Sequence, residues 1–365
     1  MKKLVFYLGV FMTVSCAGRT EKEIIPFRAP KTIQAFEELV IRVEAYPLQT
    51  EKAPVIGADP QLMVLDDGSY VVKSRGKNSI LHFSSTGQYL NAIGSQGNET
   101  GECLDICSIQ EDICNIQARN NRVIIFTKAD EILYYEPSGK LVQEDREVPL
   151  GTQSFWVPEG ILSYYGFGSG RDWRVSLLGD NGYENHYLPT KAKVIHLTAG
   201  SPVFFEHDSS VFFTDTYSPT IYKYENGEVS PYLTFDFGKY AIRDEFFENE
   251  DAYESMNKLL SGEFAMIQRY MENENYQLVE FFIQSPSGLK DFYGIKSNGG
   301  WMWVSAGDKN DSPFFHSIQW MDENAVYCLV EPSRLKNEKG ILSSIAGRNS
   351  LKETDNPLVI KLFLK

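Results

Sequence analysis

The 365-residue chain carries 49 acidic and 35 basic residues and has a formal net charge of −14 at pH 7. A field of that sign repels nucleic-acid phosphates and anionic membrane surfaces, so function classes that depend on attraction to either are excluded. The length allows one large domain or two ordinary ones.

The first residues have the order of an export signal. A lysine pair precedes an uncharged run, Leu4 to Val14, and a small residue stands directly before Cys16. The run is shorter than the roughly 20 residues that a membrane-spanning helix needs. The cysteine resembles the acylated residue of the bacterial lipoprotein lipobox, although Thr13 stands where leucine is usual. A signal peptide over 1–16 with acylated Cys16 is predicted, and a secreted protein cut near Cys16 is the alternative.

Residues 17–35 mix charged residues with Pro26 and Pro30 and lack a clear period. Such composition favours a flexible tether, so residues 36–365 are expected to form the folded domain.

A repeat runs through the folded part. The strings HFSSTGQYL, YYEPSGKLV, LLGDNGYEN and KYENGEVSP each place a glycine in a polar turn between strand-like residues: Gly87, Gly139, Gly182 and Gly227. Glycine is favoured there because hairpin turns need positive φ. Another short strand precedes each turn, and about six such units are counted. Small sheets that cannot bury both faces alone predict an all-β, six-bladed β-propeller.

Two further expectations concern closure and helices. FEELVIRVEAYPL and NPLVIKLFLK are strand-like, and pairing them in the last blade would remove exposed edges. Between 243 and 274 an amphipathic stripe with three- and four-residue steps predicts a helical insertion, divided at Gly262 and docked on the propeller, and a partner-binding groove or lid is the alternative. Its members are Tyr253, Met256, Leu260, Phe264, Ile267 and Met271. A weaker helical patch lies between Ser333 and Ile345.

The segment GSYVVKSRGKNSILHFSSTGQYLNAIGSQGNETGE resembles the first blade of bacterial six-bladed β-propeller lipoproteins, relatives of the TolB-like and NHL-like propellers. The matching positions are Phe83, Gly87, Ile93, Gly94, Gly97, Gly101 and Glu102. The pattern departs at Thr100 and Cys103, where the family usually has proline and an aromatic residue. The resemblance implies the propeller fold and an envelope location.

The run AIGSQGNETGE is interpreted as a crossover between blades. A phosphate-binding loop would need a helix after Gly101 or a G-x-x-x-x-G-K-[ST] spacing, and neither is present. For the cysteines beyond Cys16, zinc, buried thiols and one disulfide remain open, although no C-x-x-C pair accompanies them. They are Cys103, Cys107, Cys114 and Cys328.

The strongest candidate ligand contacts are Arg171, Asp172 and Trp173 in GFGSGRDWR, which combine a forked donor, an acceptor and a flat apolar surface. The alternative is a hairpin whose Trp173 packs between blades. Trp301 and Trp303 share one strand face and are expected to pack between sheets. The five histidines show no triad or metal spacing.

Two functions follow. The first is a monomeric, non-catalytic lipoprotein of the outer membrane, periplasmic or at the surface, without a cofactor. Its propeller would bind a protein, peptide or glycan partner and no nucleic acid. The alternative is a propeller hydrolase or lyase, similar to lactonase-like enzymes, that holds calcium in its central channel. Asp215, Asp291 and Asn298 are the candidate calcium ligands.

Overall fold

The computed structural model describes most of the chain between Glu23 and Lys365. The described residues are 23–57, 60–74, 79–96, 102–103, 113–166, 169–179, 181–190, 204–242, 254, 257–258, 261–306, 317–336, 338 and 340–365. The predicted signal peptide, Cys16 and residues 17–22 of the predicted tether lie outside them, as does Cys107.

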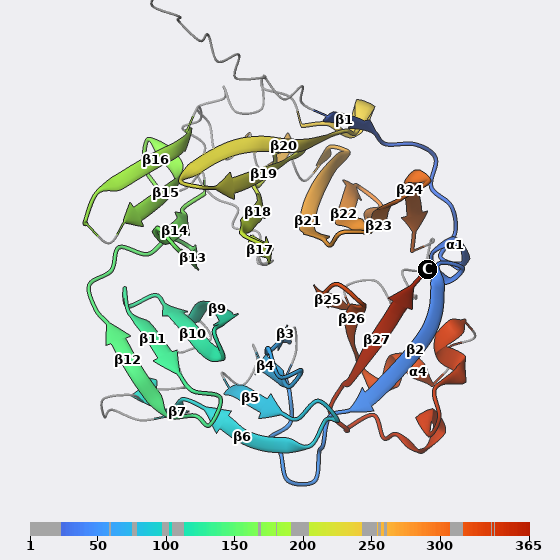
Figure 1. The fold of residues 1–365 in the computed structure, drawn as a ribbon. Coiled ribbons are helices and arrows are strands. Elements are labelled where there is room, and N and C mark those ends of the chain that lie inside the picture. The colour runs from blue at the N-terminus through green and yellow to red at the C-terminus, as the bar shows by residue number, and fades with distance from the viewer. Residues whose placement is uncertain are drawn as a thin grey trace, which may run out of the picture.

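In the described part of the chain, six sheets of mainly antiparallel strands are arranged around one axis (Figure 1). We name them blades A to F in chain order, and the strands of blades A to C run from the axis outward. Blade A contains β3 (Gln61–Val64), β4 (Tyr70–Ser74), β5 (Ser79–Phe83) and β6 (Tyr89–Ile93). Blade B contains β9 (Ile113–Arg119), β10 (Arg122–Thr127), β11 (Ile132–Tyr135) and β12 (Leu141–Asp145). Blade C contains β13 (Gln153–Val157), β14 (Gly160–Tyr164), β15 (Trp173–Gly179) and β16 (Glu184–Pro189).

Blades D to F complete the ring. Blade D contains β17 (Phe204–His207), β18 (Ser210–Thr214), β19 (Thr220–Glu225), β20 (Glu228–Asp236) and, outermost, β1 (Glu23–Pro26). Blade E contains β21 (Phe264–Glu272), β22 (Gln277–Ser285), β23 (Gly288–Ser297) and β24 (Gly300–Ser305). Blade F contains β25 (Ile318–Met321), β26 (Val326–Val330), β27 (Leu358–Leu364) and β2 (Val40–Pro47).

Short elements lie between the blades. The described ones are the parallel pair β7 (Ser95–Gln96) and β8 (Glu102–Cys103), the helices α1 (Gln34–Glu37) and α4 (Pro332–Leu335), and the single 3₁₀ turns η2 (Gly238–Tyr240), η3 (Ile341–Ser344) and η4 (Arg348–Ser350). The predicted helical patch at 333–345 is therefore found as α4 and η3. No described helix is long and apolar enough to cross a membrane.

Alternation along the strands explains why neighbouring blades pack. In β4, Tyr70 and Val72 lie in the apolar cluster between blades F and A, whereas Val71 lies in the cluster between blades A and B. Successive side chains of a strand point to opposite faces, so a strand buried on both sides is apolar at every position. Each fully buried side chain of this kind contributes about 1.5–3 kcal/mol. The predicted radial stacking of small sheets is confirmed.

The ring closes as predicted. β2 pairs antiparallel with β27 from Val40 beside Leu364 to Pro47 beside Leu358. Blade F therefore takes its outermost strand from the start of the folded chain and the other strands from its end, which leaves no gap between the last blade and the first.

The tether prediction is wrong from Glu23 onward. β1 pairs parallel with β20, and Ile25 is buried. The ring of Phe27 packs edge-on against Trp303 at 5.3 Å, and Lys31 bonds to the backbone of β24. The apolar residues of EIIPF are enough to form an edge strand and fill an aromatic site, although the flanking prolines and charges suggested a linker.

The predicted helical insertion is also partly wrong, because β21 occupies its second half. Glu254, Asn257, Lys258 and Ser261 are helical, and the amide of Gly262 bonds to the carbonyl of Lys258. That glycine ends the helix instead of dividing two helices. A bulge between Ile267 and Arg269 shifts the strand alternation, so the buried residues Phe264, Ile267 and Met271 fall at three- and four-residue steps that imitate a helical stripe.

All four repeat glycines adopt positive φ, between 77° and 88°. Gly87 carries a second constraint, since a Cβ there would lie 2.3 Å from the carbonyl oxygen of Pro47 at the end of β2. The carbonyl of Gly87 also accepts a bond of 2.8 Å from the amide of Gln49. This turn thus joins blade A to the closing strand.

We expect Gly87→Ala to destabilise the protein more than Gly182→Ala. Both residues lose the conformation that only glycine adopts at low cost, worth about 1 kcal/mol, but only Gly87 meets backbone atoms. The clash adds about 1–3 kcal/mol. Urea unfolding of the two variants measures the difference, and equal losses would contradict the role of the Gly87 contact. Gly182 is the matched control, because nothing lies within 4 Å of its added Cβ.

Candidate functional site

Side chains of the innermost strands connect blades that are not neighbours. Arg119 at the end of β9 in blade B places Nη1 3.0 Å from Oε1 of Glu206 on β17 in blade D. Its guanidinium also lies 4.2 Å above the ring of Trp156 in the intervening blade C. Burial raises the pKa of Glu206, and Arg119 opposes that rise. Together with Trp156, the pair therefore links three consecutive blades.

Side-chain amides extend the same contact along the innermost strands of blades B and C. Gln117 donates to the carbonyl of Trp156 at 3.1 Å and accepts from its amide at 2.9 Å. Asn115, on the same strand face, accepts from the amide of Ser154 at 3.2 Å. The two amides thus satisfy backbone groups of β13 that would otherwise be buried without partners.

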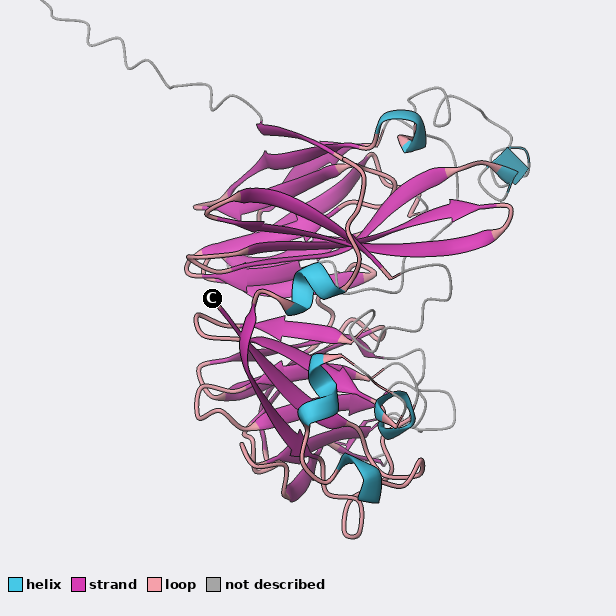
Figure 2. Ribbon diagram, turned by 90° about the vertical axis from the view of Figure 1, so that its right-hand side faces the viewer, coloured by secondary structure: helices cyan, strands magenta, loops and turns pink. Residues whose placement is uncertain are grey.

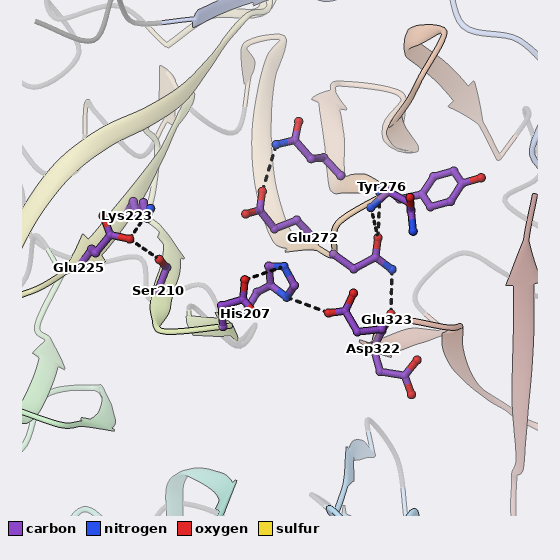
Figure 3. Close-up of polar contacts among 12 residues, drawn as sticks. His207, Ser210, Lys223, Glu225, Glu272, Tyr276, Asp322 and Glu323 are labelled. Carbon is purple, nitrogen blue, oxygen red and sulfur yellow. Dashed lines mark hydrogen bonds and ion pairs between the residues drawn. The ribbon is translucent and has the colours of Figure 1, made fainter. Parts of the chain in front are cut away.

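A second set of polar contacts joins blades D, E and F near the axis, on one face of the ring (Figure 3). Nδ1 of His207, from blade D, lies 3.4 Å from Oε1 of Glu323 in the β25–β26 turn of blade F. Asn273, from blade E, donates to the carbonyl of Asp322 at 2.8 Å. This face carries the turn between the first and second strands of each blade, and we call it the turn face. The opposite face is the crossover face.

The buried carboxylate of Glu272 lies at the end of β21, next to Asn273. It accepts hydrogen bonds from the hydroxyls of Tyr270 and Tyr232 and from the side-chain amide of Gln277. Burial and the neighbouring carboxylate raise the pKa of both tyrosines, so they remain hydrogen-bond donors. Because Tyr232 belongs to blade D, the cluster fastens blade D to blade E.

The residues proposed as calcium ligands are not assembled into a metal site. Asp215 is bound by Arg174, and Asn298 lies in the exposed turn between β23 and β24. Asp291 is buried on β23. Among the described residues, no group of three or more His, Cys, Asp or Glu side chains is arranged to hold a metal ion. Of the cysteines, Cys328 is buried and has a free thiol, and burial raises the pKa of that thiol.

The predicted ligand contacts lie at the start of β15, near the outer part of blade C. The guanidinium of Arg171 lies 4.0 Å above the ring of Tyr165, and its Nη1 is 3.5 Å from Oε1 of Glu184. The indole of Trp173 stacks on the imidazole of His186 with ring centroids 3.5 Å apart and an interplanar angle of 8°. We call Tyr165, Arg171, Trp173, Glu184 and His186 the blade C cluster.

The structure brings Arg171 and Trp173 together but leaves the exposed side chain of Asp172 out of the cluster. Asp172 contributes only its carbonyl, which accepts from the amide of Thr190 at 2.8 Å. The ring that stacks on Trp173, His186, belongs to β16 of the same blade. Its indole nitrogen is buried and has no hydrogen-bond partner. By contrast, Trp301 and Trp303 do pack between sheets, edge-on against Phe235 of blade D.

A buried ion pair supports the cluster from behind. Nε and Nη2 of Arg174 lie 3.0 and 2.9 Å from Oδ2 of Asp215 in blade D, and the hydroxyl of Tyr164 donates to Oδ1 at 2.9 Å. Burial raises the pKa of Asp215, while Arg174 and Tyr164 oppose the rise. The sequence signal that could have revealed this pair is an arginine at a buried position of an otherwise apolar strand.

We expect Arg174→Met to cost about 3–5 kcal/mol of unfolding free energy at neutral pH, because it leaves the carboxylate of Asp215 buried without its cation. In the variant, protonation of Asp215 relieves this cost. The loss should therefore be smaller near pH 4 than at pH 8, since a raised native pKa favours the folded state at low pH. Chemical denaturation at both pH values measures the effect.

The matched control is Arg146→Met, which removes an exposed guanidinium that pairs with Glu144 and should leave stability nearly unchanged at both pH values. A loss for Arg174→Met as small as that of the control would contradict a buried ion pair that holds blades C and D together.

Solved structures share this architecture. A protein of Bacteroides fragilis NCTC 9343 that carries the description "exported protein" matches with a TM-score of 0.74 and 16% identity, over 94% of this chain and 99% of its own. A member of the DUF4221 family from Bacteroides vulgatus matches with a TM-score of 0.56 and 10% identity, over 89% and 96%. At these identities the likeness concerns the fold.

No protein of curated function matches the chain significantly in sequence. A family model does match, over residues 24–363, which is nearly all of the folded part. The chain therefore belongs to the family described as "Domain of unknown function (DUF4934)".

Proposed function

We propose that this chain is an exported, acylated protein of the cell envelope whose propeller is a non-catalytic module that binds a protein, peptide or glycan partner. The observation that carries the proposal is the blade C cluster. It holds aromatic and cationic groups on a rigid blade, within reach of solvent.

The chemistry of the cluster suits a partner with flat or hydroxyl-rich surfaces. Arg171 supplies a planar donor whose geometry matches carboxylate and carbonyl groups, and it is only one-third exposed because Tyr165 supports it. Trp173 is partly exposed, and aromatic rings are common where proteins bind sugars and peptides. His186 is the ring that a partner would displace from Trp173.

The engagement of charged side chains near the axis in contacts between blades supports a binding role over channel chemistry. The contacts between Arg119 and Glu206 and between His207 and Glu323 use the charged groups of the axis to hold blades together. Groups engaged in this way fix a scaffold on which the outer surface of each blade is held in place.

The envelope location is proposed from the sequence. The lysine pair, the short apolar run and Cys16 form the predicted acylation signal, and the segment around Phe83 and Gly87 resembles propeller lipoproteins related to TolB-like and NHL-like proteins. Two or more acyl chains would make the membrane attachment stable, whereas a single chain would not.

We expect Arg171→Ser combined with Trp173→Ser to reduce partner retention at least about tenfold. A tenfold change in affinity corresponds to about 1.4 kcal/mol, and loss of a central interface residue commonly costs more than this. Envelope extracts and glycan and peptide arrays, probed with the soluble domain 23–365, provide the readout. Thermal unfolding of the variant establishes that it is folded.

The matched control is Lys239→Ser, which removes an exposed lysine that lies over the ring of Tyr240 on another blade connection. This variant should retain the partner as the parent protein does. Equal retention by all three proteins, or stoichiometric calcium in the purified parent protein, would count against the proposal.

A further inference from the structure

The seam between blades F and A holds a lysine on a buried sheet face. Lys361 lies on β27, two residues after Val359, which belongs to the apolar cluster between these blades. Residues two apart on a strand share a face, so the side chain of Lys361 points into the same seam. β27 and the outer strand β2 are on the right of Figure 1, the side that faces the viewer in Figure 2. A cation therefore lies within a largely apolar contact between two blades.

Three tyrosine rings lie around the ammonium of Lys361. Its Nζ is 5.2 Å from the ring centroid of Tyr46 on β2, 5.1 Å from that of Tyr327 on β26 and 5.6 Å from that of Tyr70 on β4. All three distances are within the roughly 6 Å at which an aromatic face attracts a cation. We call the three tyrosines the seam cage. Because two rings come from blade F and one from blade A, the ammonium bridges the two blades.

The rings are the main counterpart of this ammonium. Among the residues that the structure describes, Lys361 forms no ion pair and no side-chain hydrogen bond. Its side chain is partly buried, and an ammonium that loses water needs a compensating interaction. The aromatic faces supply that interaction, so the seam cage holds the cation in place.

Two carboxylates orient the cage and make its potential more negative. The hydroxyl of Tyr46 donates to Oε2 of Glu44 at 2.8 Å, and the hydroxyl of Tyr327 donates to Oδ2 of Asp322 in the β25–β26 turn. Arg42 pairs with Glu44 at 3.2 Å, whereas no cation within the described ranges forms an ion pair with Asp322. Hydrogen bonds to carboxylates fix the rings, and the charge that remains favours a cation between them.

Tyr70 adds a polar group that Lys361 does not use. The side chain of Tyr70 is completely buried, and its hydroxyl has no hydrogen-bond partner in the described part of the chain. Burial raises the pKa of this hydroxyl, and the nearby Tyr46, Glu44 and Asp322 raise it further. Buried hydroxyls are usually paired, because an unpaired one loses its bonds to water without replacement. The cage therefore retains a hydrogen-bonding group beside the ring faces.

We infer that the seam cage is a binding site for alkylammonium groups, and that the chain's own Lys361 is its resident ligand. The ring faces and the carboxylates select a positive charge, and the hydroxyl of Tyr70 can accept a bond from an N–H group. A neutral group of the same shape gains neither charge interaction. Occupation of the cage fastens blade F to blade A where the ring closes. The inference is independent of acylation and of the blade C cluster.

Removal of the resident side chain tests the inference. Lys361→Ala deletes the atoms that correspond to propylammonium. Free propylammonium should therefore bind to the full-length variant at least about tenfold more tightly than to the parent protein, in which Lys361 competes. The readout is the rise of the urea unfolding midpoint with propylammonium chloride, because a ligand of the folded state stabilises it. 1-Propanol and sodium chloride control for the apolar stem and for ionic strength, and neither should produce this rise.

Two further variants separate the cage from the stem. Lys361→Met fills the site with an uncharged side chain and should not respond to propylammonium. Lys361→Ala combined with Tyr46→Leu removes one partly exposed ring and should respond less than Lys361→Ala alone. Equal responses of the parent protein and Lys361→Ala, or an equal response to 1-propanol, would refute the ammonium site.

The parent protein offers a measurement that needs no cavity variant. Its lysines are dimethylated with ¹³C-formaldehyde, and the signal of Lys361 is identified by its loss in Lys361→Arg. Because aromatic ring currents act on groups above a ring face, this methyl signal should be displaced from those of the exposed lysines. A signal at the position of the exposed lysines would also refute the inference, even if Lys361→Ala does not fold.

Discussion

The structure depends on the face-to-face packing of sheets that are each buried on both sides. β10 illustrates the constraint, since Val123 and Ile125 lie in the cluster between blades A and B, while Ile124 and Phe126 lie in the cluster between blades B and C. A single blade would expose one of these two faces to water. Each blade is therefore stable only between its two neighbours. The pairing of β2 with β27 completes blade F, which packs against blade A and closes the ring.

Polar contacts add direction to this apolar packing. The amides of Gln117 and Asn115 fix the height of β13 against β9, and Glu272 joins the tyrosines of two blades. Arg174 and Asp215 do the same at the boundary of blades C and D. Hydrogen-bonded groups have one favourable geometry where apolar contacts have many, so these residues determine how far each blade is rotated against the next. The pair of Arg174 and Asp215 holds β15, which carries Trp173 of the blade C cluster, against blade D.

Periodic features were predictable from the sequence and isolated contacts were not. The turn glycines, the short strands and the pairing of the two ends could be predicted, because hairpin turns favour glycine and a closed ring pairs its terminal strands. The stripe from Phe264 to Met271 was misassigned because a bulge in a doubly buried strand gives helix-like spacing. Arg171 and Trp173 were found as neighbours in sequence, whereas Glu184 and His186 join them only through the β15–β16 pairing. The meeting of His207 and Glu323, from blades that are not adjacent, has no sequence signal at all.

The shared blade F has a consequence for how the molecule folds. β2 is made near the start of synthesis, but its partner β27 is made last, so the pair has the largest sequence separation of any strand pair in the described chain. Contacts of this kind form slowly, because the intervening chain loses entropy before the pairing stabilises it. Until synthesis is complete, β2 has an unsatisfied edge, and an unfinished ring can pair with another copy. Arg42 and Glu44 place charged side chains on this strand, and charged edge strands are disfavoured as partners for another chain.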